Sequence, residues 1–339
     1  MLHAPSLDRV PTGRPFLTVE EAPNKRLKLT GGDRSKGSGV CRPALMARPF
    51  VLLSLFALAA SPSRLLTQDS LRRVVVDSYA FAYVDRGTGP AIVLVHGALT
   101  DYRTWTNQLD AFSQSYRVIA YSRRYHYPNS WVSGGPNYTY AQNVADLAGV
   151  IRALQLGPVH LVGHSWGASV ALLFTLRHPE LVRSLTLVEP GLDSLIVDAK
   201  GRAAAAAALR NAYARAGAVY REDDPIPALR ALLDAWFGHG WFDRQPDELR
   251  HRFVDNARTV PLAAAPQPAV SCADLQRLRV PVLLIQGELS DPEYHAVIDG
   301  VGECVASAER VEIRGAPHTM HRTHTANFNA ALLAFLQRH

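Results

Sequence analysis

Short apolar runs alternate with helix-spaced segments along most of this chain, and this alternation limits the possible folds more than any other feature. From residue 72 onward, eight runs have the character of strands: RRVVVD, YAFAYVDRG, AIVLVHG, YRVIAYS, VHLVG, SLTLVEP, PVLLIQG and RVEIRG. Helical spacing occurs in the segments 139–156, 168–178, 292–304 and 325–339. Buried strands separated by helices predict a mostly parallel sheet covered on both faces, which is an α/β architecture.

The segment 191–278 interrupts this alternation. It contains an alanine tract, the proline-punctuated DDPIPALRALLDAWFGHGWF and the helix-spaced PDELRHRFVDNAR, with no strand pattern. A segment of about eighty residues is too long for a plain connecting loop. We therefore expect a helical lid inserted after the sixth strand, and a core formed by residues 72–190 and 279–339.

The N-terminal part differs from the rest in composition. Residues 1–45 are rich in Pro, Gly, Arg and Lys without a sustained period, which is typical of disorder. Residues 46–60 combine an early Arg48, an apolar run and the small-x-small pattern Ala57-Leu58-Ala59, which together predict a signal peptide. The apolar run is shorter than the roughly twenty residues that span a bilayer.

We accordingly expect translation to begin at Met46, with residues 1–45 a mis-annotated extension. The protein would then be secreted or periplasmic, with no stable membrane insertion after signal cleavage. The alternative is a disordered tail before an uncleaved anchor helix. If residues 46–60 are not a functional signal, the protein is cytoplasmic.

Charge and cysteine content add two expectations. The net charge of +6 comes largely from the first seventy residues, and the nearly neutral remainder predicts no nucleic-acid surface. After signal cleavage only Cys272 and Cys304 remain. They could form a disulfide in an oxidising compartment, but we expect two buried free thiols instead.

The sequence VHLVGHSWGASVALLF, residues 159–174, places Ser165 between Gly163 and Gly167 where a strand pattern gives way to a helix pattern. A serine on a sharp strand-to-helix turn projects its hydroxyl above the sheet edge, and the turn tolerates only small neighbours. The N-terminus of the following helix favours developing negative charge at the same place. The segment therefore predicts a nucleophile elbow.

Three further motifs accompany this elbow. LVHGAL resembles the oxyanion loop of the α/β-hydrolase fold family, YSRRYHYPN resembles its YDRRGFG loop, and RGAPHTMHRTHTANFNAALLAFL resembles its terminal histidine segment. Together with GHSWG they occur in the family's order, and the resemblance extends from about Arg72 to the C-terminus, about four fifths of the chain. The resemblance is to the serine-nucleophile, esterase-like branch with a helical lid, and implies an eight-stranded, mostly parallel sheet.

The resemblance also implies a catalytic triad. Ser165 would be the nucleophile, and His318 matches the family's catalytic histidine. Two carboxylates remain open as the acid. Asp291 follows the seventh strand, where the family most commonly carries its acid, and we place it slightly ahead, although it lies one residue beyond the usual spacing. Glu189 ends the sixth strand, where some branches carry the acid instead.

The remaining expected site residues lie in the oxyanion loop, the elbow and the lid. The backbone N–H groups of Ala98 and Trp166 would hold the oxyanion. His96, Leu99, Trp236 and Phe237 would contact the substrate. No metal or organic cofactor is expected.

These features predict a serine hydrolase that cleaves a carboxylic ester or a related small acyl compound through an acyl-enzyme. Epoxide hydrolase chemistry is disfavoured because it requires an aspartate at the elbow. A cofactor-free haloperoxidase or perhydrolase, a C–C bond hydrolase and a proline-type peptidase use the same triad and stay open. The alternative of another class is a non-catalytic ligand-binding protein on this fold. The sequence does not predict the acyl group, the leaving group or the oligomeric state.

Overall fold

The computed structural model of the protein describes residues 17–19, 70–132, 134–263 and 266–339. The strands in these ranges are β1 (Leu17–Val19), β2 (Arg72–Val76), β3 (Tyr79–Arg86), β4 (Ala91–Val95), β5 (Arg117–Tyr121), β6 (Val159–His164), β7 (Val182–Val188), β8 (Val282–Gly287) and β9 (Glu309–Ile313). They form one sheet in the order β1-β9-β8-β7-β6-β4-β5-β3-β2. Only the β2–β3 and β3–β5 pairs among them are antiparallel. The expected α/β class is confirmed, and each of the eight expected strands is present.

The ninth strand, β1, was not expected. It lies in the segment 1–45 and pairs in parallel with β9, so that Leu17 is opposite Val311. Three residues are too few to give a periodic pattern in the sequence, and the strand depends on backbone pairing with the edge of the sheet. The rest of that segment and the expected signal peptide at 46–60 lie outside the described residues. No helix in the described ranges has the length and apolar character needed to cross a bilayer.

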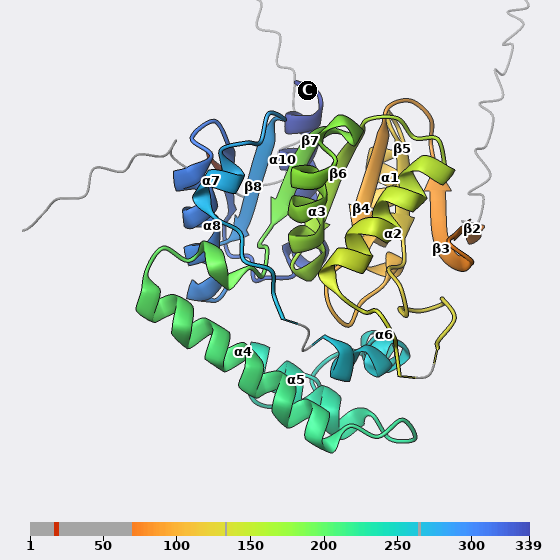
Figure 1. Ribbon diagram of the computed structural model, residues 1–339, viewed down its shortest axis with the longest axis vertical. Helices are drawn as coiled ribbons and strands as arrows, with labels where there is room; N and C mark the ends of the chain where they lie inside the picture. The colour runs from red at the N-terminus through yellow and green to blue at the C-terminus, as the bar shows by residue number, and fades with distance from the viewer. Residues whose placement is uncertain (1–16, 20–69, 133, 264–265) are drawn as a thin grey trace, which may run out of the picture. The chain divides into compact units, whose positions relative to one another are not determined.

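Helices cover both faces of the sheet. One apolar cluster joins the sheet to α2 (Tyr140–Ala153), α3 (Trp166–Arg177) and α8 (Pro292–Cys304), and the other joins it to α1 (Thr106–Phe112) and α10 (Thr325–Leu336). Figure 1 shows α2 and α3 crossing one face of the sheet. The short helices of the core are η1 (Tyr102–Trp105), η2 (Pro179–Leu181), η3 (Asp193–Leu195), α7 (Cys272–Leu275) and α9 (Met320–Thr323).

Between β7 and β8 the chain forms further helices, α4 (Ala199–Val219), α5 (Ile226–Phe237), α6 (Asp247–Asn256) and η4 (Ala257–Leu262). We call α4 to η4 the helical insertion. It lies beyond one end of the strands (Figure 1). The insertion has its own apolar cluster, which includes the fully buried Leu229 and Leu232 of α5 and the buried Phe253 of α6. This packing explains how it can remain folded away from the sheet.

The two cysteines form a disulfide, so the expectation of two buried free thiols is wrong. Cys272 begins α7 and is exposed, Cys304 ends α8, and their Cα atoms are 5.2 Å apart. The short helix α7 packs beside the last turn of α8, an arrangement that spacing in the sequence does not reveal. A bond between residues 32 positions apart stabilises the fold by about 3–4 kcal/mol in the chain-entropy model.

Candidate active site

Ser165 lies at the turn between β6 and α3, in a backbone conformation that few non-glycine residues adopt. Its φ is 54° and its ψ is −124°. The two flanking glycines allow this turn: a Cβ on Gly163 would lie 2.5 Å from Cα of Ala168, and one on Gly167 would lie 2.4 Å from the carbonyl oxygen of His96. The expected strand–turn–helix geometry around Ser165 is therefore present, with strain typical of functional sites.

His318 lies in the loop between β9 and α9 and contacts a buried carboxylate. Its Nδ1 is 2.5 Å from Oε2 of Glu189, the residue that follows β7. Glu189 is completely buried, and its Oε1 accepts a hydrogen bond of 2.7 Å from the N–H of Gly287. Because the carboxylate accepts a hydrogen bond from Nδ1–H, the other ring nitrogen of His318 is left to accept a proton from a substrate or nucleophile.

Asp291 does not lie against His318. Its side chain is exposed at the start of α8, and it has no hydrogen bond or ion pair with His318 among the described residues. The turn after β8 brings Ser290 back to Gly287, through a hydrogen bond between their backbones, before Asp291 is reached. The geometry thus reverses the order of the two candidate acids, since Glu189 contacts the imidazole.

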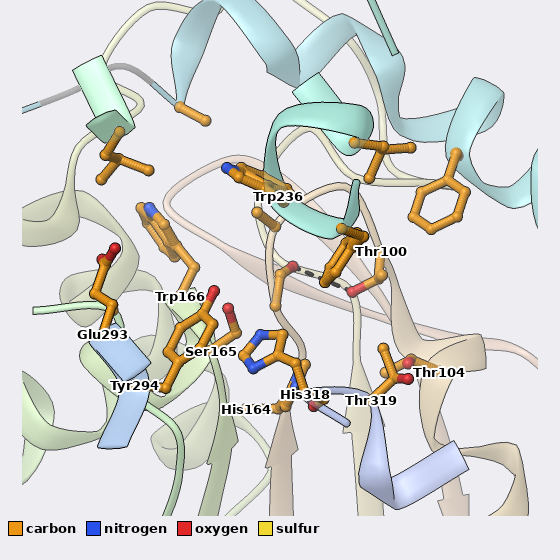
Figure 2. Close-up of a pocket in the computed structure, with 18 of the residues that line it drawn as sticks. Thr100, Thr104, His164, Ser165, Trp166, Trp236, Glu293, Tyr294, His318 and Thr319 are labelled. Carbon is orange, nitrogen blue, oxygen red and sulfur yellow. Dashed lines mark hydrogen bonds between the residues drawn. The ribbon is translucent and has the colours of Figure 1, made fainter. Parts of the chain in front are cut away.

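Ser165 and His318 line one cavity at the carboxyl ends of the strands. It encloses about 940 Å³ of empty space, part of it open to solvent. Figure 2 shows both side chains in this cavity, with Trp236 of the insertion across from them. The apolar walls come mainly from the insertion, through Leu209, Tyr213, Leu233, Trp236, Phe237, Trp241 and Phe253. Trp236 and Phe237 therefore lie where the sequence analysis expected substrate contacts.

Two backbone donors face the same cavity. Ala98 follows β4 and Trp166 is the first residue of α3, and both line the cavity beside Ser165. Neither N–H has a backbone acceptor within the described ranges. Gly97 allows the close approach of the two segments, because a Cβ there would lie 3.2 Å from Cβ of Ser165. The arrangement can stabilise negative charge on an oxygen bonded to an atom that Ser165 attacks.

Two residues expected to contact the substrate, Leu99 and His96, are absent from the lining of the Ser165 cavity. Leu99 is 1% exposed and packs in the apolar cluster of the insertion, where it borders a small pocket that adjoins the cavity of Ser165. His96 is fully buried below the cavity. Its Nε2 accepts a hydrogen bond of 2.9 Å from the N–H of Arg123, and burial lowers its pKa well below the ordinary value. Its neutral ring therefore joins the oxyanion loop to the backbone of Arg123.

Arg123 is a site residue that the sequence analysis missed. Its guanidinium donates hydrogen bonds to the carbonyl oxygens of His96, at 3.0 Å, and Gly97, at 2.9 Å. It also lies 4.2 Å from the ring centre of Trp166. Arg123 and Arg124 are adjacent in the sequence, and no local pattern distinguishes the one that is buried. Arg123 is 1% exposed and joins the oxyanion loop to the elbow.

Two aromatic rings fix the position of His318. Tyr294 of α8 stacks on its imidazole, with ring centres 4.0 Å apart and planes 11° from parallel. His164 lies next to it, and its Nε2 is 2.9 Å from the carbonyl oxygen of His318. Burial is the main reason that the pKa of His164 falls well below its ordinary value, so this ring is a neutral donor to that carbonyl.

A second carboxylate, Glu293, lines the cavity on the side of Tyr294, as Figure 2 shows. Burial raises its pKa from 4.5 to about 7, and the nearby charges of Asp193 and Asp291 add to this effect. Glu293 is consequently protonated in the folded protein over a pH range in which the unfolded chain is ionised. No trio of His, Cys, Asp or Glu side chains in the described part of the chain is grouped as metal ligands would be.

The raised pKa of Glu293 predicts a pH-dependent effect of Glu293→Gln. Between about pH 4.5 and about pH 7 the folded protein holds a proton that the unfolded chain has lost, so stability falls as pH rises through this window. The amide of Gln cannot ionise, so the variant does not lose this stability as pH rises. At pH 8 we expect the variant to gain about 1–2 kcal/mol after solvent screening, which is a Tm about 2–6 °C higher. At pH 4 the two proteins should melt alike.

Thermal melts at both pH values check this, with Glu303→Gln as the matched control. Glu303 lies at the exposed end of the same helix. We expect its substitution to leave the pH dependence of Tm unchanged. An equal shift at pH 4 and pH 8 in Glu293→Gln would rule out the ionisation argument.

The sheet order, the elbow and the buried histidine–carboxylate pair are those of an α/β-hydrolase fold. Residues 92–331 match the family model described as the alpha/beta hydrolase family. This match spans more than half of the chain, and the chain therefore belongs to the alpha/beta hydrolase family.

The individual relatives include enzymes that are named for different reactions. Epoxide hydrolase 3 of Siraitia grosvenorii is 36% identical over 100 residues, which are 29% of this chain and 32% of that enzyme, so the match covers about a third of this relative's length. The 2-(acetamidomethylene)succinate hydrolase of Mesorhizobium japonicum is 27% identical over 265 residues, covering 73% of this chain and 88% of that enzyme. The solved enol-lactonase from Burkholderia xenovorans LB400 superposes with a TM-score of 0.64 at 22% identity, covering 78% of this chain and all of the other, which shows a common fold.

Proposed function

We propose that this member of the family is a serine hydrolase that cleaves a carboxylic ester or a related small acyl compound. The observation that carries the proposal is the buried contact of His318 with Glu189 in the cavity that Ser165 also lines. A serine hydroxyl is a weak nucleophile unless a positioned base removes its proton, and the base must itself be oriented by an acid. Ser165, His318 and Glu189 supply these three roles.

The reaction proceeds in two halves. Oγ of Ser165 attacks the acyl carbon while Nε2 of His318 takes the hydroxyl proton, and Glu189 stabilises the imidazolium that forms. The carbonyl oxygen becomes an oxyanion held by the N–H groups of Ala98 and Trp166. When the bond to the leaving group breaks, His318 delivers the proton to it. A water molecule, deprotonated by the same ring, then attacks the acyl-enzyme and releases the acid and free Ser165.

The helical insertion serves as the lid of this site. Its aromatic residues Trp236, Phe237 and Trp241 line the cavity, and the ring centre of Phe237 lies 6.3 Å from that of His318. An apolar ceiling this close to the imidazole favours an acyl or leaving group with an apolar portion, and excludes water from the developing charges. Gly238 and Gly240, which have positive φ values of 91° and 71°, form the turn after Phe237.

The serine at the elbow favours acyl transfer over epoxide opening. In the epoxide hydrolase reaction an elbow aspartate forms the ester intermediate, whereas a serine forms an acyl-enzyme by attacking a carbonyl. The similarity to the epoxide hydrolases thus supports membership of a common family and not a common reaction. A binding protein without turnover would not need a preserved base and acid behind Ser165.

A fluorophosphonate probe tests the proposal directly. We expect it to label wild-type protein at Ser165, because the probe phosphonylates a serine activated by its base, with loss of fluoride, and to leave folded Ser165→Ala unlabelled. Mass spectrometry of the labelled peptide identifies the site. A screen of p-nitrophenyl esters of increasing chain length then defines the acyl preference. Folded wild-type protein that is neither labelled nor active on any ester would refute the proposed function.

A further inference from the structure

Arg322 lies in α9, four residues after His318, and lines the cavity of Ser165. It also lines a small adjoining pocket next to the insertion, together with Thr100, Thr104 and Phe253, which line both spaces. Among the described residues, its guanidinium has no hydrogen bond and no ion pair. An arginine in a cavity wall without a counterion is unusual, because burial of an unpaired charge is costly.

The neighbouring arginines are all paired. Arg252, which shares the adjoining pocket, is 2.6 Å from Glu248, and Arg103 is 2.7 Å from both Asp101 and Asp255. Arg322 alone in this group keeps an unengaged charge. Burial lowers its pKa below the ordinary value, and the charge of Arg252 adds to this effect. Glu248 lies close enough to act on this charge but is paired with Arg252, so an incoming anion would meet a guanidinium that no protein group pairs with directly.

Hydroxyl groups surround the same part of the cavity. Thr319 lines the cavity three residues before Arg322, and its side-chain hydroxyl has no partner in the described ranges. Figure 2 shows Thr100, Thr104 and Thr319 on one side of His318 and Glu293 on the other. The cavity thus has a cationic, hydroxyl-lined side that is separate from its carboxylate side.

We infer that Arg322 binds a carboxylate of the substrate, so that the enzyme prefers acyl compounds that carry a negatively charged group away from the reacting carbonyl. The inference rests on the proposed function. A guanidinium can hold a carboxylate through two parallel hydrogen bonds, and the free hydroxyl of Thr319 offers a further donor. One unpaired arginine balances one negative charge, which fits a carboxylate better than a phosphate monoester with nearly two.

Matched ester pairs test this inference in wild type and in Arg322→Gln. The first pair is mono-p-nitrophenyl adipate and p-nitrophenyl hexanoate, which differ by a carboxylate on the acyl side. The second is 4-carboxyphenyl butyrate and phenyl butyrate, which differ by a carboxylate on the leaving group. In at least one pair, we expect the ratio of kcat/KM for the charged over the neutral ester to fall by about 10–100-fold in the variant.

Arg230→Gln is the control for loss of a positive charge. Arg230 is exposed on the insertion and paired with Asp243 at 2.9 Å, so its substitution should leave both ratios unchanged. Arg322→Gln should also melt no lower than wild type, because it removes a partly buried charge that has no partner in the described ranges. Ratios that are equal in wild type and Arg322→Gln for both pairs would overturn the inference, while hydrolysis of the neutral esters would still uphold the proposed function.

Calorimetric titration with adipate and with the uncharged hexanamide gives a readout that needs no turnover. We expect wild type to bind adipate at least about tenfold more tightly than Arg322→Gln does, with no such difference for hexanamide. If wild type hydrolyses no ester, the proposed function fails, and this titration still decides whether Arg322 binds a carboxylate. Equal adipate affinities in the two proteins would show that it does not.

Discussion

We expect Ser165→Ala to lower kcat on the best p-nitrophenyl ester by about 10³-fold or more, and His318→Ala to do the same. The expected losses are this large because the nucleophile and its base act in one step, so that removing either leaves only the oxyanion donors and substrate binding. For the same reason the double variant is scarcely slower than either single variant. Steady-state kinetics of the three proteins, with thermal melts to verify folding, provide the measurement.

His324→Ala is the matched control for the histidine. His324 follows α9 on the same loop region and contacts Thr323, and it does not line the cavity. We expect its kcat to remain within about threefold of wild type, the usual scale of a surface substitution. If the losses in Ser165→Ala and His318→Ala multiplied in the double variant, His318 would not be the base for Ser165.

We expect Glu189→Gln to reduce kcat by about 10⁴-fold, the loss seen when the acid of a well-studied triad is replaced by its amide. The reason is the contact between Oε2 of Glu189 and Nδ1 of His318, at 2.5 Å. An amide in this place cannot stabilise the imidazolium, and its NH2 group favours the wrong tautomer of the ring. The isosteric change should keep the protein folded, which thermal melts can verify.

Asp291→Asn is the comparison that makes this test specific. The exposed carboxylate of Asp291 lies outside the cavity lining, so we expect a loss of kcat of about tenfold or less. A severe loss in Asp291→Asn together with a mild one in Glu189→Gln would contradict the geometry. Mild losses in both would leave a Ser–His dyad, and the role proposed for Glu189 would be wrong.

Much of the core could be predicted from the sequence, because each expected strand is a run of apolar residues long enough to show its own period. The elbow was predictable for a related reason. The constraint on Gly163 is local, since the atoms that exclude a side chain there belong to Gly167 and Ala168 a few residues away. The constraint on Gly167 comes from the carbonyl oxygens of Val95 and His96, so the spacing of the motif and not the contact makes it recognisable. In contrast, the strand at Leu17–Val19 forms through its pairing with β9. A segment of three residues contains no pattern that predicts pairing with a strand some 290 positions later.

The parts of the site that sequence reasoning missed depend on distant contacts. Whether Glu189 or Asp291 faces the imidazole is decided by how the turn after β8 closes, and not by either residue's neighbours in the chain. Arg123 and Arg322 look alike in the sequence, yet one is bonded to the oxyanion loop and the other has no partner in the described ranges. Side-chain pairing of this kind becomes visible only in three dimensions.

The two oxygens of Glu189 have a consequence for how this architecture can vary. Oε2 contacts His318, whereas Oε1 accepts the N–H of Gly287 at the end of β8. Neighbouring strands lie about 4.8 Å apart, so their ends offer two adjacent positions from which a side chain can reach the same imidazole. In this protein β7 supplies the charge and β8 supplies a backbone amide that prevents the carboxylate from rotating. The histidine requires a negative charge at one point in space, and either strand end can deliver it.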